Sequence, residues 1–240
     1  MSATNSSEKH LASMLDRLQA NGAYSDLKIV CGSDTYLVHK AIVCPQSDFF
    51  RAACRSNAFK EGQTGVVNIS ASSGRDDDFF TRPISAEIFD WDLDVETTQS
   101  VKLMIHYFYH HDYLEQETSR GSQKAQLYFS DCRKGAVAEH SRMYAMGEKY
   151  GIPGLKNLAI AKFRLSAITW VNHAGLAAGI AIVYNSTPEA DKGLRKEVIE
   201  ALDRYRLYYT SNSEIQKMIA SIPDLCYGLY RKVLEHEGLR

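Results

Sequence analysis

The chain has 240 residues, enough for one large domain or for a domain with an extension. It is 45% hydrophobic and 24% charged, as in an ordinary globular protein, and its formal net charge is -1. This balance argues against a surface made for phosphate backbones or anionic lipid, so we expect no direct nucleic-acid partner and no membrane partner.

Cysteine usage and the first residues predict an intracellular protein, and leave cytoplasm and nucleus open. The five cysteines are odd in number and contain no CxxC pair, which suits reduced thiols better than a disulfide framework. No basic segment with a following apolar run comes after Met1, so we expect no signal peptide. The most apolar later stretch, Ala174 to Tyr184, is about half the length that a membrane span needs.

The N-terminal part of the chain predicts an amphipathic helix followed by a hairpin. Residues 7–21 carry apolar side chains at helical spacing, and Gly22 follows as a stop signal. Residues 27–31 alternate apolar and polar side chains, as a half-buried strand does. A tight turn at 32–34 then leads to a second strand at 36–38.

Two short helices and a third strand are expected next. A helix that starts near His39 must end by Pro45, because proline disfavours helical geometry in the residue before it. Ser47 is a suitable cap for the following helix, and residues 66–69 have the pattern of a short strand. These elements predict a small, mostly antiparallel sheet of short strands surrounded by helices.

Two polar, turn-rich segments at 71–92 and 114–135 are expected to be surface insertions. Between them Asp94 is a plausible cap for a helix, and further helix is expected at 136–150 and at 155–163. The apolar face of the helix after Asp94 comprises Val101, Met104, Ile105 and Phe108.

The remaining residues predict only helices. Thr187 followed by Pro188 is a helix start signal, with the hydroxyl as cap and proline at the first helical position. Ser213 with Gln216 forms a capping box, and Pro223 ends that helix and opens the last one. We therefore expect an all-helical C-terminal extension.

Three sequence blocks in a characteristic order carry a resemblance to a known family. The blocks are Ser25-Asp26-Leu27 with Val38-His39-Lys40, residues 101–113, and residues 142–150 with Leu155 and Ala159. In this combination the chain resembles the BTB/POZ domain, which implies an α/β fold of the α+β kind. The implied parts are an N-terminal dimerisation helix at 1–22, a BTB/POZ domain at 23–165 that contains both insertions, and the helical extension at 166–240.

Within that family, Glu61-x-x-x-Gly65 and Thr187-Pro-Glu-Ala-Asp191 make the chain most similar to the BTB domain-containing proteins of filamentous fungi. The resemblance implies a protein-protein interaction scaffold that homodimerises. Its more concrete form is a substrate adaptor for a cullin-3 ubiquitin ligase, and the alternative is a transcriptional co-regulator scaffold without a ligase role.

The resemblance also assigns a dimer interface. Its residues are Leu11, Met14, Leu15 and Leu18 on the first helix, together with Asp26 and Lys40. The alternatives for the helix are packing on its own chain or a flexible leader. Asp26 and Lys40 match family positions in a charged pocket at the dimer groove, where an ionised side chain needs a partner. The alternative is that both are ordinary residues at a strand end and a helix start.

Phe59-Lys60-Glu61 fits the apolar-x-Glu triplet that BTB adaptors place against cullin-3. In such a contact an aromatic anchor fills a pocket beside a carboxylate that sets the register. Three-residue patterns also occur by chance, so packing within the chain is the alternative.

No pattern predicts catalysis or a cofactor. His106 and His110 are spaced i, i+4 on a helix and His111 follows, which raises the remote alternative of a zinc-dependent enzyme. No HExxH signature, Gly-rich phosphate loop or nucleophile elbow accompanies them. We therefore expect solvent-facing histidines, no metal, no cofactor and no enzyme. His39 is expected to be a structural histidine that caps a helix start.

Overall fold

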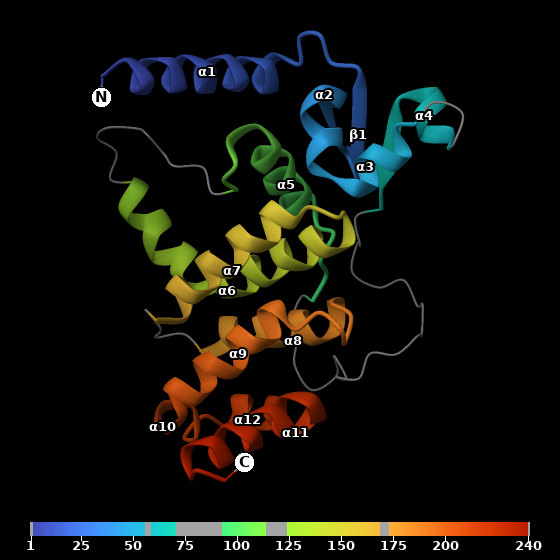
Figure 1. The fold of residues 1–240 in the computed structure, drawn as a ribbon. Helices are drawn as coiled ribbons and strands as arrows, with labels where there is room; N and C mark the ends of the chain where they lie inside the picture. The colour runs from blue at the N-terminus through green and yellow to red at the C-terminus, as the bar shows by residue number, and fades with distance from the viewer. Residues whose placement is uncertain (1, 56–58, 71–92, 114–123, 169–172, 240) are drawn as a thin grey trace. The chain divides into compact units, whose positions relative to one another are not determined.

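The computed structural model describes residues 2–55, 59–70, 93–113, 124–168 and 173–239, and Figure 1 shows their helices and strands in chain order. The chain divides into two compact units, which are described in turn. The first comprises Met1–Ser73, Glu96–Gln116 and Met146–Lys156, and the second comprises Gly74–Val95, Glu117–Ala145 and Asn157–Arg240.

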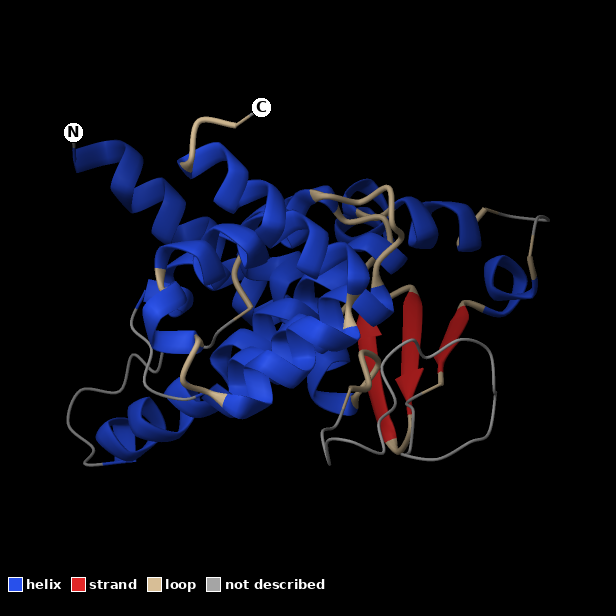
Figure 2. Cartoon of the chain, turned by 90° about the horizontal axis from the view of Figure 1, so that it is seen from below, coloured by secondary structure: helices blue, strands red, loops and turns tan. Residues whose placement is uncertain are grey.

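The first unit contains a three-stranded sheet, in which β1 (Leu27–Cys31) lies between β2 (Asp34–Val38) and β3 (Val66–Ile69) (Figure 2). β1 pairs antiparallel with β2, from Leu27 opposite Val38 to Cys31 opposite Asp34, but it pairs parallel with β3. The sheet is therefore mixed, and the expectation of a mostly antiparallel sheet was wrong for β3. Parallel strands need a crossover connection, which the helices between β2 and β3 supply.

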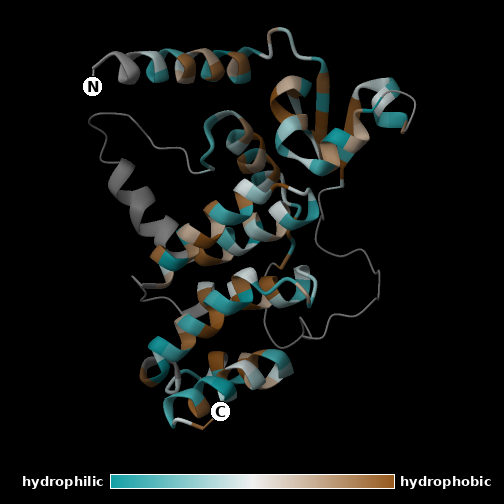
Figure 3. Cartoon of the chain, viewed as in Figure 1, coloured by the Kyte–Doolittle hydropathy of each residue, from teal (hydrophilic) through white to brown (hydrophobic). Residues whose placement is uncertain are grey.

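The helix that precedes the sheet, α1 (Ser2–Asn21), carries both polar and apolar residues along its length (Figure 3). Gly22 follows it with φ +60°, a left-handed conformation that glycine adopts without strain, and its N–H donates to the carbonyl of Leu18. The predicted helix and its stop signal are confirmed, and the helix starts five residues earlier than expected.

Short helices connect β2 with β3. They are α2 (Lys40–Val43), the 3-10 turn η1 (Cys44–Gln46), α3 (Asp48–Ala53) and α4 (Lys60–Thr64). Ser47 caps α3 as predicted: its Oγ accepts a hydrogen bond from the N–H of Phe50 at 3.2 Å. The same Oγ donates to the carbonyl of Tyr150 at 2.6 Å, so one buried hydroxyl joins two segments that are far apart in sequence.

Helix α5 (Thr98–His110) carries the apolar face that its spacing predicts, and all four expected residues of that face are buried. Its cap is Thr97, whose Oγ1 accepts from the N–H of Ser100 at 3.0 Å, so the expectation of Asp94 as the cap was wrong. A cap must stand immediately before the first helical residue, and Asp94 is three residues too early.

Two long helices follow, α6 (Lys124–Lys149) and α7 (Pro153–Ile168). The helix expected at 136–150 therefore begins at Lys124, and the second half of the expected insertion at 114–135 is helical instead of a polar loop. The insertion at 71–92 and the first part of the other, residues 114–123, lie outside the described residues. Gly151 makes the turn between the helices with φ +60°.

The described residues of the second unit that lie beyond α7 form only helices, which confirms the all-helical C-terminal region. They are α8 (His173–Ser186), α9 (Gly193–Arg204), α10 (Arg206–Tyr209), α11 (Ser213–Ser221) and α12 (Pro223–His236). α8, the most apolar stretch, is buried along most of its length. Within the described ranges, no helix combines the length and apolarity that crossing a membrane requires.

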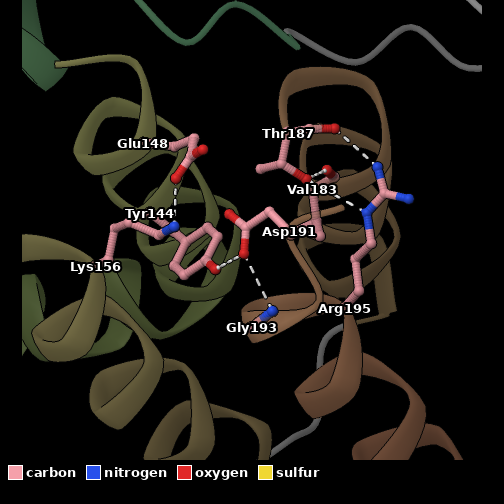
Figure 4. Close-up of polar contacts among 8 residues, drawn as sticks. All are labelled: Tyr144, Glu148, Lys156, Val183, Thr187, Asp191, Gly193 and Arg195. Atoms are coloured by element: carbon pink, nitrogen blue, oxygen red, sulfur yellow. Dashed lines mark hydrogen bonds and ion pairs between the residues drawn. The ribbon is translucent and has the colours of Figure 1, made fainter. Parts of the chain in front are cut away.

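Thr187 does not start a helix, contrary to expectation (Figure 4). Its Oγ1 donates to the carbonyl of Val183 at 2.6 Å and so closes the end of α8. α9 begins six residues later, where Asp191 accepts a hydrogen bond from the N–H of Gly193 at 3.2 Å and another from the hydroxyl of Tyr144 at 2.6 Å. The side chain that organises the start of α9 is therefore Asp191.

The predicted capping box of α11 is displaced by one residue. Asn212 is the cap, because its Oδ1 accepts from the N–H of Ile215 at 3.1 Å, whereas Ser213 is already helical. Asparagine and serine are comparable caps, so the sequence pattern does not separate them. Pro223 opens α12 as predicted.

Candidate functional site

The described residues cover only part of the apolar stripe of α1, which comprises Leu11, Met14, Leu15 and Leu18. Leu11 is 53% exposed and Met14 is 40% exposed, whereas Leu15 and Leu18 are half-buried. A continuous apolar stripe on a helix normally faces a core or a partner. The first helix therefore presents a surface that a second chain could cover, and dimerisation through it stays a prediction.

The helix is attached to α5 through His110. Nε2 of His110 lies 2.6 Å from Oε1 of Gln19, and Nδ1 lies 3.2 Å from Oδ1 of Asp16. The ring of His110 stacks on that of His106, with 4.1 Å between centroids, and Nδ1 of His106 lies 2.8 Å from the carbonyl of Asp112. The expectation that these two histidines face solvent was wrong, because the ring contacts leave both half-buried.

His111 is the exposed member of the histidine group, and it ends α5 with φ 53°. Tetrahedral zinc needs three or four convergent ligands. Across the part of the chain that the structure describes, no group of three or more His, Cys, Asp or Glu side chains is placed to hold a metal ion. The contacts of His110 with Gln19 and Asp16 instead attach α1 to α5, and the ring of His106 stacks on that of His110.

Asp26 and Lys40 meet at the start of α2, through the backbone of Lys40. Oδ1 of Asp26 accepts a hydrogen bond from the backbone N–H of Lys40 at 2.7 Å, which satisfies one of the free N–H groups at that helix end. Asp26 is exposed and Lys40 is half-buried. This geometry is that of a helix-start contact, and the role of both residues in a dimer pocket stays a prediction.

His39 is a structural histidine that stands at the N-cap position of α2, where its carbonyl accepts from the N–H of Val43 at 3.0 Å, but its side chain does not cap the helix. It is buried, with Nδ1 2.7 Å from the hydroxyl of Tyr109 and Nε2 2.7 Å from the carbonyl of Ala23. No side-chain bond from His39 reaches the first turn of α2. Burial raises the pKa of the Tyr109 hydroxyl to about 12, so the phenol stays protonated and can donate to His39 at neutral pH.

Phe59 and Glu61 stand at the start of α4. Phe59 is the residue immediately before the helix and is 56% exposed, whereas Glu61 lies in the first turn and is half-buried. Gly62 allows α4 to pack closely against the segment that follows α3. A Cβ at position 62 would come within 2.2 Å of the carbonyl oxygen of Arg55. Gly65 then ends the helix in the left-handed conformation, with its N–H donating to the carbonyl of Glu61 at 2.8 Å.

The thiols of Cys31 and Cys44 are not activated as nucleophiles. Burial is the largest cause that raises the pKa of Cys31, and it raises the pKa of Cys44 to about 12. Both thiols are therefore protonated at neutral pH, and a protonated thiol is a poor nucleophile. Cys31, Cys44, Cys54 and Cys226 are free.

Two polar arrangements have no counterpart in the sequence patterns. One is the contact of His110 with Gln19, which are 91 residues apart, and the other is the bond of Tyr144 to Asp191, which are 47 residues apart. The only local signal for the second was the turn-rich Thr187–Asp191 segment. Neither pairing follows from spacing, because each depends on how the helices pack.

Residues 15–76 match the profile of the BTB/POZ domain. No curated protein matches the chain. The match begins within α1 and includes the whole three-stranded sheet and α2 to α4, so it covers Phe59, Glu61, Asp26 and Lys40. Residues 15–76 therefore form a BTB/POZ domain region, of the class that mediates protein-protein interactions, and a helical C-terminal region follows it.

Proposed function

We infer that this protein is an interaction scaffold that homodimerises through α1 and joins a target to a cullin-3 ubiquitin ligase through Phe59 and Glu61. The match over residues 15–76 supports the general part, a protein-interaction domain. The homodimer and the cullin-3 contact go beyond what this match supports. The surfaces proposed for them, on α1 and at Phe59 and Glu61, lie within or directly before the matched residues.

The exposure of Phe59 is the observation that carries the cullin contact. An aromatic side chain that served only packing within the chain would be covered, yet 56% of Phe59 is exposed. Glu61 follows on the first turn of α4, where the helix geometry holds the carboxylate at a set spacing from the ring. An exposed aromatic anchor beside a carboxylate is the arrangement of an interface hot spot.

Calorimetric titration of the purified chain with purified cullin-3 tests the contact. The wild type is expected to bind, and the double variant Phe59→Ala with Glu61→Ala is expected to lose roughly 2 kcal/mol or more, about 30-fold in Kd. A matched control is Tyr230→Ala with Glu237→Ala, since Tyr230 is 57% exposed and lies on α12.

Equal weakening by the control pair would contradict the assignment of the contact to α4. Absence of binding by the wild type would contradict the ligase role itself, and a scaffold without a ligase role, such as a transcriptional co-regulator, would then be the better proposal.

A further inference from the structure

A groove of about 420 Å³ lies in the second unit, between the end of α8, α9 and α12. Ile199 on α9 and Gly228 on α12 are among its lining residues. The absence of a side chain at Gly228 brings the two helices together, because a Cβ there would come within 2.4 Å of Cδ1 of Ile199. The groove is thus a product of close helix packing.

The charged residues of the groove are not balanced. Five cationic and three acidic side chains line it. All three carboxylates are already engaged: Asp224 lies 3.4 Å from Arg195, and Glu200 and Glu235 lie 2.7 and 3.3 Å from Lys232. The groove therefore has cations in excess, although the chain as a whole carries a formal net charge of -1.

Two carboxylates share Lys232, so the surplus of two charges leaves three cations outside these ion pairs, namely Lys192, Lys196 and Arg231. All three are exposed, and none forms an ion pair with another described residue. Lys192 and Lys196 stand at the start of α9, and Arg231 lies on the facing helix α12. Positive charge thus projects from both sides of the groove.

Arg195 gives the groove a fixed wall. It is only 5% exposed, and its guanidinium donates to the carbonyl of Thr187 at 2.8 Å (Figure 4) and lies 4.7 Å from the ring centre of Tyr184. Side chains that are held by packing and hydrogen bonds need little ordering when a ligand arrives. Tyr227 adds an aromatic surface to the same groove and is 63% exposed.

We propose that this groove binds an acidic peptide segment of a partner protein. Isolated carboxylates along an extended peptide can pair individually with Lys192, Lys196 and Arg231, while an apolar side chain between them contacts Tyr227. A nucleic-acid backbone fits less well, because its closely spaced phosphates would meet the three groove carboxylates and a chain without net positive charge. This inference goes beyond the cullin contact and does not depend on it.

Fluorescence anisotropy of a short fluorescein-labelled peptide of aspartate and glutamate residues around one leucine tests the proposal on the full chain. The wild type is expected to bind the peptide, with an affinity that falls as salt is raised, and not to bind a counterpart in which lysine replaces the acidic residues. The variant Lys196→Glu with Arg231→Glu is expected to raise Kd roughly tenfold or more, because two attractive contacts become repulsive.

Arg206→Glu with Lys217→Glu is the matched control, since it makes the same charge change at exposed positions of the same unit outside the groove. The control is expected to bind within about twofold of the wild type. The proposal is overturned if the wild type does not bind the acidic peptide, if both double variants weaken it equally, or if unlabelled oligothymidylate binds the groove more tightly. Phe59 and Glu61 remain intact in these variants, so failure here is separate from failure of the cullin contact.

Discussion

Replacing Leu11 and Met14 with glutamate is expected to convert a dimer into a monomer. Both side chains belong to the apolar stripe of α1 and are exposed within the single chain, so their replacement removes little from the protomer's own core. Glutamate is a helix former comparable to leucine and methionine, so α1 itself is expected to persist. The change therefore acts on the surface that a second protomer would cover.

The size of the effect follows from the exposed fractions. Full burial of a leucine or methionine side chain contributes roughly 1.5–3 kcal/mol relative to full exposure. With 53% of Leu11 and 40% of Met14 exposed, covering the remainder contributes about 1 kcal/mol per side chain. A two-fold dimer covers two copies of each, so the pair contributes about 4 kcal/mol, roughly 1000-fold in Kd.

Sedimentation velocity over a protein concentration series measures this directly. The wild type is expected to sediment as a dimer at tens of micromolar, and the variant as a monomer. Ser13→Glu with Ala20→Glu is the control, because these exposed residues lie on the opposite face of α1 and add the same charge. A monomeric wild type would refute the reasoning, and so would a control that dissociates as readily as the stripe variant.

Two further predictions concern stability. Ser47→Ala is expected to lower the free energy of unfolding by roughly 1–3 kcal/mol in urea titration, because it removes the α3 cap and the donor to Tyr150. Ser213→Ala, at a position that is not a cap, is expected to change it by less than about 0.5 kcal/mol, and equal costs would contradict this difference. Burial raises the pKa of Tyr184 from 10.0 to about 12, so the folded chain holds the phenol proton more tightly than the unfolded chain, and its stability falls as pH rises through that interval. Tyr184→Phe is expected to make this alkaline loss shallower, and an unchanged alkaline loss in this variant would contradict the assignment to Tyr184.

The order of elements in the first unit could be predicted because local chemistry carries it. Alternation across Leu27 to Cys31, the glycine after α1 and the serine before α3 each express a preference that acts within a few residues. The same locality explains the errors at helix starts. Thr97 caps α5 in place of the expected Asp94, and Asn212 caps α11 in place of the expected Ser213. Several residue types cap equally well, so the choice among neighbouring candidates depends on where the packed helix begins.

The sequence alone was enough to determine the α+β class, the three short strands, the family resemblance over the BTB/POZ region and the triplet that contains Phe59 and Glu61. Only the tertiary structure decided that β3 runs parallel to β1, that Phe59 is exposed, and that His110 contacts α1. It also decided that cations from α9 and α12 gather in one groove. Secondary structure follows periodic patterns between near neighbours, whereas exposure and charge surplus depend on contacts between residues that lie tens of positions apart.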